Sequence, residues 1–147
     1  MRQQRIILHE ASTVLSHRLL RYGRRFRYAV LRHSSDLAWL SSHPLSLSKL
    51  TIFLAEATRN SKRGGTPLLL AAYQSATDTF LVVPSMGLEG SEGVAGAERN
   101  RFGLAFRRAT QLVRARVQHD GFDAAMIEVK GEDLKGFLQI LQTIPLA

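Results

Sequence analysis

The chain has 147 residues, of which 45% are apolar, and it carries 20 lysines and arginines against 12 acidic residues. This length fits one domain with a sizeable core, and the apolar fraction excludes a wholly disordered chain. The absence of cysteine excludes disulfide scaffolds, thiolate metal sites and thiol catalysis together. No apolar run approaches the roughly 20 residues that a membrane-spanning helix requires. The net charge of +8 favours a polyanionic partner.

The N-terminal segment carries most of this charge. Residues 1–35 hold eight arginines and a single acidic residue, Glu10, which gives a net charge of +7. An Arg-rich, Ser-rich stretch with apolar residues at helical spacing is typical of organelle targeting sequences. We therefore interpret residues 1–45 as a retained, basic helical extension, with helices predicted at 6–20 and 27–41 and an end near Pro44. The alternative is a solvated amphipathic helix packed on the domain.

Residues 46–147 are predicted to form an α/β domain. Three short apolar runs separated by polar turns predict an antiparallel meander, with strands at 50–55, 67–73 and 79–83. The third strand is expected to stop at Pro84. The glycine-rich stretch 85–100 matches no nucleotide-binding motif, so we expect it to form a loop that contacts a partner.

The C-terminal part alternates helix and strand. Helical spacing predicts a helix over 101–118 with Gly121 as its C-cap, then a buried strand at 124–129. A final helix is expected to begin at a cap on Asp133. The order β-β-β-α-β-α predicts a mixed sheet in which the crossover helix makes the last strand parallel to its neighbour.

This order is that of the ribonuclease-H-like folds, and residues 50–141 resemble the universal small-subunit ribosomal protein eleven family. Three stretches carry the resemblance, namely Thr51 to Asn60, Arg99-Asn100-Arg101-Phe102 after the glycine-rich loop, and Ile127-Glu128-Val129-Lys130-Gly131. The chain departs from that family by continuing to Glu132-Asp133 and by lacking its basic C-terminal tail. The large-subunit ribosomal protein eighteen family shares the fold and is the close competitor.

The resemblance implies a structural constituent of the ribosome. The expected partners are ribosomal RNA, in the small-subunit platform, and neighbouring ribosomal proteins. A divergent domain with a basic N-terminal extension suits a mitochondrial ribosome, so the expected location is the mitochondrial matrix. A large-subunit protein of the same fold, or a non-ribosomal RNA- or protein-interaction module, is the alternative.

Basic side chains in turns and on helix flanks are the predicted RNA contacts. The planar fork of arginine fits phosphate oxygens, and such contacts position a protein on structured RNA. The predicted set is Arg24, Arg25, Arg27, Arg59, Lys62, Arg63, Arg99, Arg101, Arg107, Arg108, Arg114 and Lys130. For Arg107 and Arg114 a solvated helix flank is the alternative.

A catalytic role is not expected. Nucleases of the ribonuclease-H-like class hold two metal ions with several carboxylates. Glu56 and Glu128 are the candidates here, and the predicted 101–118 helix supplies no third carboxylate. The histidines show neither H-x3-H nor HExxH spacing. We therefore expect no metal, cofactor or small-molecule substrate, and we keep a metal-dependent nuclease as the rival of another class.

Overall fold

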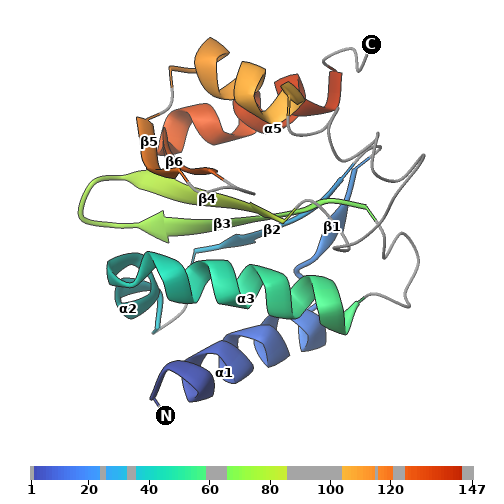
Figure 1. Ribbon diagram of the computed structural model, residues 1–147, viewed down its shortest axis with the longest axis vertical. Helices are drawn as coiled ribbons and strands as arrows, with labels where there is room; N and C mark the ends of the chain where they lie inside the picture. Colours follow the sequence, from blue (N-terminus) through green and yellow to red (C-terminus); the bar gives the residue numbers. More distant parts are fainter. Residues whose placement is uncertain are drawn as a thin grey trace.

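The computed structural model describes residues 2–23, 26–32, 36–58, 66–85, 104–114, 116–120 and 125–143. These residues form a six-stranded mixed sheet with helices on both faces (Figure 1). The strand order is β1-β2-β3-β4-β6-β5. The predicted α/β class with a mixed sheet is therefore confirmed. In the described residues, no helix has the length and apolar character needed to cross a membrane.

The elements follow one another as α1 (Arg2–Ser16), β1 (Arg21–Tyr22), β2 (Arg27–Leu31), α2 (Leu37–Ser42), α3 (Pro44–Ala57), β3 (Leu68–Gln74), β4 (Thr79–Ser85), β5 (Arg116–Asp120), β6 (Ala125–Lys130), a 3-10 turn η1 (Gly131–Asp133) and α5 (Leu134–Thr143). A further helical segment covers residues 104–112. We call α1, α2 and α3 the lower layer, and segment 104–112 with α5 the upper layer, after their places in Figure 1.

The sheet contains one parallel pair, β2 with β3, among the described strands. A parallel pair needs a crossover, and α2 and α3 provide it beneath the sheet. Strands β3 and β4 form the predicted hairpin, and β6 is the predicted buried strand. The expectation that the last strand lies parallel to its neighbour is wrong, because β6 is antiparallel to both β4 and β5.

The first predicted strand, 50–55, is instead part of helix α3. Pro44 occupies the first turn of this helix, where a missing N–H costs nothing and the fixed φ suits the helix. Leu47, Leu50 and Leu54 are fully buried, and their spacing of three and four residues places them on one helical face. The order β-β-β-α-β-α is therefore wrong at its first element, because the apolar stripe outweighs the β-preferring side chains of this run.

The predicted helix at 27–41 is likewise replaced at its start by strand β2. Along this strand burial alternates, with Arg27, Ala29 and Leu31 buried and the residues between them half-buried. Alternation with a period of two is the pattern of a strand. Pairing with β3 along five residues satisfies the backbone groups on one edge of β2, and β1 pairs with Arg27 and Tyr28 on the other edge. Helix α2 then covers Leu37–Ser42, the last part of the predicted helix.

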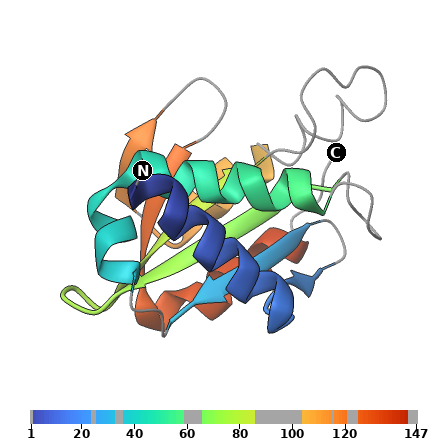
Figure 2. The same cartoon turned by 90° about the horizontal axis from the view of Figure 1, so that it is seen from below.

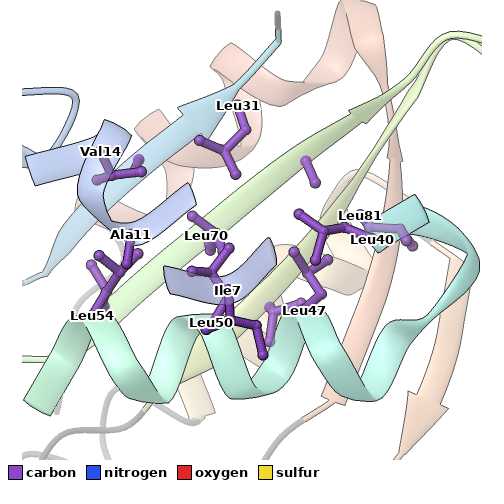
Figure 3. Packing of buried hydrophobic residues seen from close by; sticks show 14 of the residues in the cluster. Ile7, Ala11, Val14, Leu31, Leu40, Leu47, Leu50, Leu54, Leu70 and Leu81 are labelled. Atoms are coloured by element: carbon purple, nitrogen blue, oxygen red, sulfur yellow. The ribbon is translucent and has the colours of Figure 1, made fainter. Parts of the chain in front are cut away.

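Residues 1–45 are part of the domain rather than an appended extension. Ile7, Ala11 and Val14 of α1 share one hydrophobic cluster with Leu31 and with residues of α3, β3 and β4 (Figure 3). The boundary predicted near residue 46 falls inside α3. Part of the basic charge of this segment therefore lies on elements whose apolar sides build the core, with Arg5 on α1 and Arg27 on β2.

The upper face of the sheet carries a second cluster, which is richer in aromatic rings. Phe80 of β4 and Phe137 of α5 are fully buried, and the Phe106 and Phe137 rings meet edge to face at a centroid distance of 5.7 Å. The predicted final helix is confirmed as α5. Of the apolar residues predicted to face the core, Leu134, Phe137 and Leu141 are buried and Leu138 is partly buried. Edge-to-face rings in a core add favourable electrostatics to the burial of their surface.

The predicted helix 101–118 is shorter in the structure. Helical residues end at 112, and Arg114 has a φ of 55°, a left-handed conformation that ends a right-handed helix. Residues 116–120 then pair with β6 as β5. Strand β4 also continues through Pro84, the predicted stop, and ends at Ser85. Proline is tolerated there because β6 pairs only with Thr79–Val82, so Pro84 has no β6 partner that needs its N–H.

Candidate functional site

Four of the predicted basic residues are exposed in the described part of the chain. Arg107 and Arg108 are exposed on segment 104–112 in the upper layer. Arg114 and Lys130 line a polar pocket at one end of the sheet. Seven further predicted RNA contacts lie outside the described residues, namely Arg24, Arg25, Arg59, Lys62, Arg63, Arg99 and Arg101. The predicted C-cap Gly121 also lies outside them.

Arg27 is the one described candidate that is fully buried. Its guanidinium donates to the Thr58 hydroxyl at 2.6 Å and to the Thr66 carbonyl at 3.0 Å. Burial lowers the pKa of Arg27, because the charged form loses hydration. Thr58 caps the C-terminus of α3, where the helix dipole favours a cation. The prediction that Arg27 contacts a polyanion is therefore wrong, since this side chain fastens β2 to the end of α3.

The polar pocket has a volume of about 640 Å³ and lies where the β3–β4 turn meets the junction of β6 and η1. Its charged lining residues are Asp78, Arg114, Glu128, Lys130, Glu132 and Asp133. Four carboxylates and two cations give it a net acidic character, which does not suit phosphate. Arg114 and Lys130 therefore sit among carboxylates rather than on a basic surface.

Hydrogen bonds hold the wall of this pocket in place. The Tyr73 hydroxyl donates to Asp78 Oδ1 at 2.8 Å, and this bond raises the pKa of Tyr73 because it stabilises the neutral phenol. The Gly131 N–H donates to the Asp78 carbonyl at 2.9 Å. A Cβ on Gly131 would lie 2.9 Å from Asp78 Oδ1, so this close approach requires glycine. The turn and the 3-10 segment are thereby locked together.

The two candidate carboxylates of the nuclease alternative are placed differently from the expectation. Glu56 lies on α3, exposed in the lower layer, and not on a strand. Glu128 lies on β6, and its Oε2 accepts a hydrogen bond from Gln74 at 3.2 Å. A strand-borne pair of these two carboxylates is therefore absent from the described residues.

A group that the sequence did not indicate joins α1 to the start of α2. One ligand-type atom each from His9, Glu10 and Asp36 lie within 4.8 Å of one another. Glu10 is buried, and both carboxylates make further interactions in the chain. Glu10 and Asp36 are 26 positions apart in the sequence and show no motif spacing, so only the fold brings them together.

A further feature is a group of exposed apolar side chains on the lower layer. Leu8 and Leu15 of α1 and Leu45, Ile52 and Phe53 of α3 are all exposed, although their helices bury their other sides against the sheet. Helices α1 and α3 pack against each other, and Figure 2 shows them together on this face. The signal was present in the sequence as pairs of apolar residues seven apart. We call these five residues the α1/α3 apolar surface.

The fold and its surfaces define a three-layer α/β domain with an unpartnered apolar helical side, which is a feature of proteins that bind other proteins. The CDC45 family matches residues 1–144 of the chain. The chain belongs to the CDC45 family.

Individual relatives agree with this assignment. The chain is 32% identical over 151 residues to the cell division control protein 45 homolog of Schizosaccharomyces pombe, which covers 96% of this chain and 24% of that protein. It is 32% identical to cell division control protein 45 of Saccharomyces cerevisiae, over 94% of this chain and 22% of that protein. The crystal structure of CDC45 from Entamoeba histolytica matches with a TM-score of 0.75 at 19% identity, over 96% of this chain and 27% of that one. At that identity the structural likeness shows the fold alone.

These matches overturn the ribosomal interpretation. The resemblance to the ribosomal protein eleven and eighteen families is wrong, because the CDC45 family accounts for nearly the whole chain and the ribosomal motifs were short. With it fall the role as a structural constituent of the ribosome, the partners ribosomal RNA and ribosomal proteins, and the mitochondrial location. The Arg-rich N-terminal segment that suggested an organelle lies within the match to the CDC45 family, and it contributes α1, β1 and β2 to the domain.

Proposed function

We propose that this chain acts as a non-catalytic protein-docking segment of a CDC45-type factor that works in the initiation of DNA replication. The observation that carries the proposal is the family match across residues 1–144, together with relatives whose names describe the control of cell division. The chain spans about a quarter of the length of the S. pombe relative. The segment is therefore proposed to supply one surface of such a factor.

The α1/α3 apolar surface supports a docking role. Single exposed apolar residues are ordinary on a protein surface, whereas a group of them on adjacent helices marks an interaction site. The large exposed residues Leu45, Leu8 and Ile52 are 65%, 55% and 54% accessible. Such exposure of large apolar side chains lowers solubility.

The placement of the carboxylates supports a non-catalytic role. Glu56 lies on a helix and Glu128 is held by Gln74. The polar pocket mixes acidic and basic residues and is braced by hydrogen bonds between its own walls. Glu56 and Glu128 therefore do not form the strand-borne carboxylate pair that the metal-dependent nuclease alternative requires.

A segment exchange in fission yeast tests the proposal. The 151 residues of the S. pombe relative that align with this chain are replaced by this chain, and growth is measured after shut-off of the resident gene. We expect the chimera to sustain growth, while a deletion of the same segment does not. A chimera that is expressed at the normal level yet supports no growth would overturn the proposed function.

A further inference from the structure

We propose that the α1/α3 apolar surface binds an acidic amphipathic helix of a partner protein. The inference rests on the proposed docking function and adds the chemistry of the partner. It follows from the spacing of the exposed apolar residues and from the charges beside them.

The apolar residues form one stripe on each helix. Leu8 and Leu15 lie seven residues apart on α1, and Leu45 and Ile52 lie seven apart on α3, with Phe53 beside Ile52. Seven residues are nearly two helical turns, so the two members of each pair point the same way. Both helices cover the same side of the sheet (Figure 2) and bury their other residues in the cluster beneath it, so we infer that both exposed stripes face outward from the lower layer.

A helix is the occupant that matches this geometry. A partner helix presents apolar anchors at i, i+3, i+4 and i+7, which repeat with the same pitch as the two stripes. It would pack on α1 and α3 as one helical layer packs on another, with side-chain ridges in grooves. An extended strand finds no edge here, because the surface is made only of helix sides.

Charge selects an acidic partner. On α1, Arg5 is exposed one turn before Leu8, and on α3, Lys49 is exposed one turn from Leu45, Ile52 and Phe53. Arg18 follows Leu15 by three residues and is also exposed. Among the described side chains of α1 and α3, Glu56 is the one exposed carboxylate, since Glu10 is buried. Cations around an apolar centre favour a partner whose apolar face is flanked by acidic side chains.

The test is binding of a labelled synthetic peptide by fluorescence anisotropy. The peptide has about three heptads with leucine at a and d and glutamate and alanine elsewhere, and a matched basic peptide carries lysine in place of glutamate. The protein variants are the double substitution Leu8→Glu with Ile52→Glu, and the control Leu112→Glu. Leu112 is exposed to 57%, close to the 54% of Ile52, but lies in the upper layer. Circular dichroism checks that each variant keeps its fold.

We expect the acidic peptide to bind the wild-type chain about tenfold or more tightly than the basic peptide, and to weaken as salt rises. The double substitution should lower the affinity about tenfold or more, because it places charge in the centre of the contact, and Leu112→Glu should leave it unchanged. Lys49→Glu should shift the preference toward the basic peptide.

Three outcomes would overturn the inference. They are equal binding of the two peptides, an equal effect of Leu112→Glu, and self-association of the chain that the double substitution abolishes while the acidic peptide does not compete. The last result would identify a second copy as the occupant. Growth of the yeast chimera together with absent peptide binding would remove the partner chemistry and leave the docking segment standing. Failure of the chimera would remove the proposed function itself.

Discussion

The two helical layers bury their inner sides in the same way and use their outer sides differently. Beneath the sheet, α1, α2 and α3 pack aliphatic residues against β2, β3 and β4, whereas above it segment 104–112 and α5 pack around phenylalanine rings. On the outside, the lower layer presents five large apolar side chains on two adjacent helices. The upper layer presents Leu104, Leu112 and exposed arginines on segment 104–112. The inner sides explain the fold, and the outer side of the lower layer points to a partner.

The two sides of the sheet also differ in their polar groups, which are a buried cation on one side and an open polar pocket near the other. In the lower half, Arg27 is a buried cation that joins β2 to α3. Near the upper layer, the polar pocket is open to solvent, and a hydrogen bond from the Tyr73 hydroxyl to the Asp78 carboxylate supports its wall. A buried charge is costly to disturb, whereas exposed polar contacts contribute little each. The two regions should therefore respond very differently to single substitutions.

The largest expected effects are core truncations, one in each layer. Phe137→Ala above the sheet should lower the free energy of unfolding by about 3–5 kcal/mol and Leu54→Ala below it by about 2–5 kcal/mol, through lost burial and the cavity left behind. Urea unfolding followed by circular dichroism measures both. If the layers form one domain, each variant should show a single shifted transition. Separate transitions would show that the two layers unfold independently and are not parts of one cooperative domain.

Arg27→Ala should follow, with a loss of about 3 kcal/mol, because the acceptors on Thr58 and Thr66 lose their buried donor. Arg27→Lys keeps the charge but not the planar fork and should lose less. Exposed Arg107 in the upper layer is the matched control, and Arg107→Ala should change stability by no more than about 0.5 kcal/mol. Equal losses at Arg27 and Arg107 in urea unfolding would contradict the buried role of Arg27.

Two glycines, Gly131 in the pocket wall and Gly136 within α5, should respond in opposite directions. Gly131→Ala should cost about 1–3 kcal/mol, since its Cβ would crowd Asp78. Gly136 lies within α5 with nothing near its would-be Cβ, so Gly136→Ala should add about 1 kcal/mol through helix propensity. Thermal unfolding of the two variants compares them directly. A stabilised Gly131→Ala would show that the turn and η1 are not locked together.

The smallest expected effect is the titration of Tyr73. Its hydrogen bond to Asp78 raises the pKa above the ordinary value of 10.0. A folded-state pKa above the unfolded one means that this bond contributes stability below about pH 10 and that the contribution is lost as pH rises through the raised pKa. Phenolate absorbance against pH measures the midpoint. Asp78→Asn should move it back toward 10.0, and an unchanged midpoint would exclude the bond as its cause.

The sequence predicted the hairpin, β6 and α5 because in each of these one pattern dominates. Strand runs between polar turns marked β3 and β4, and the stripe Leu134, Phe137 and Leu141 marked α5. The lower layer was mispredicted where two patterns compete. Residues 50–55 combine β-branched side chains with helical leucine spacing, and Pro44 can end one helix or begin the next. Residues 27–31 form a strand that pairs with β3, a segment about 40 residues away that the local pattern does not indicate.

The candidate sites divide in the same way. The apolar pairs of the α1/α3 surface can be read from their spacing once the helices are known. No sequence pattern announces the burial of Arg27 or the meeting of His9, Glu10 and Asp36, because each depends on segments far apart in the chain. Basic composition alone therefore indicated a polyanion, while the fold assigns part of that charge to the core.

The most direct test of the account is growth of the fission-yeast chimera carrying both Leu8→Glu and Ile52→Glu, compared with the chimera carrying Leu112→Glu. Substitutions at exposed positions should leave the fold intact. Protein levels are measured in parallel to check that each chimera is expressed equally. We expect that the chimera with Leu8→Glu and Ile52→Glu fails to sustain growth. The chimera with Leu112→Glu should grow like the unsubstituted chimera. Normal growth of the first chimera would contradict the claim that the α1/α3 apolar surface is a docking site.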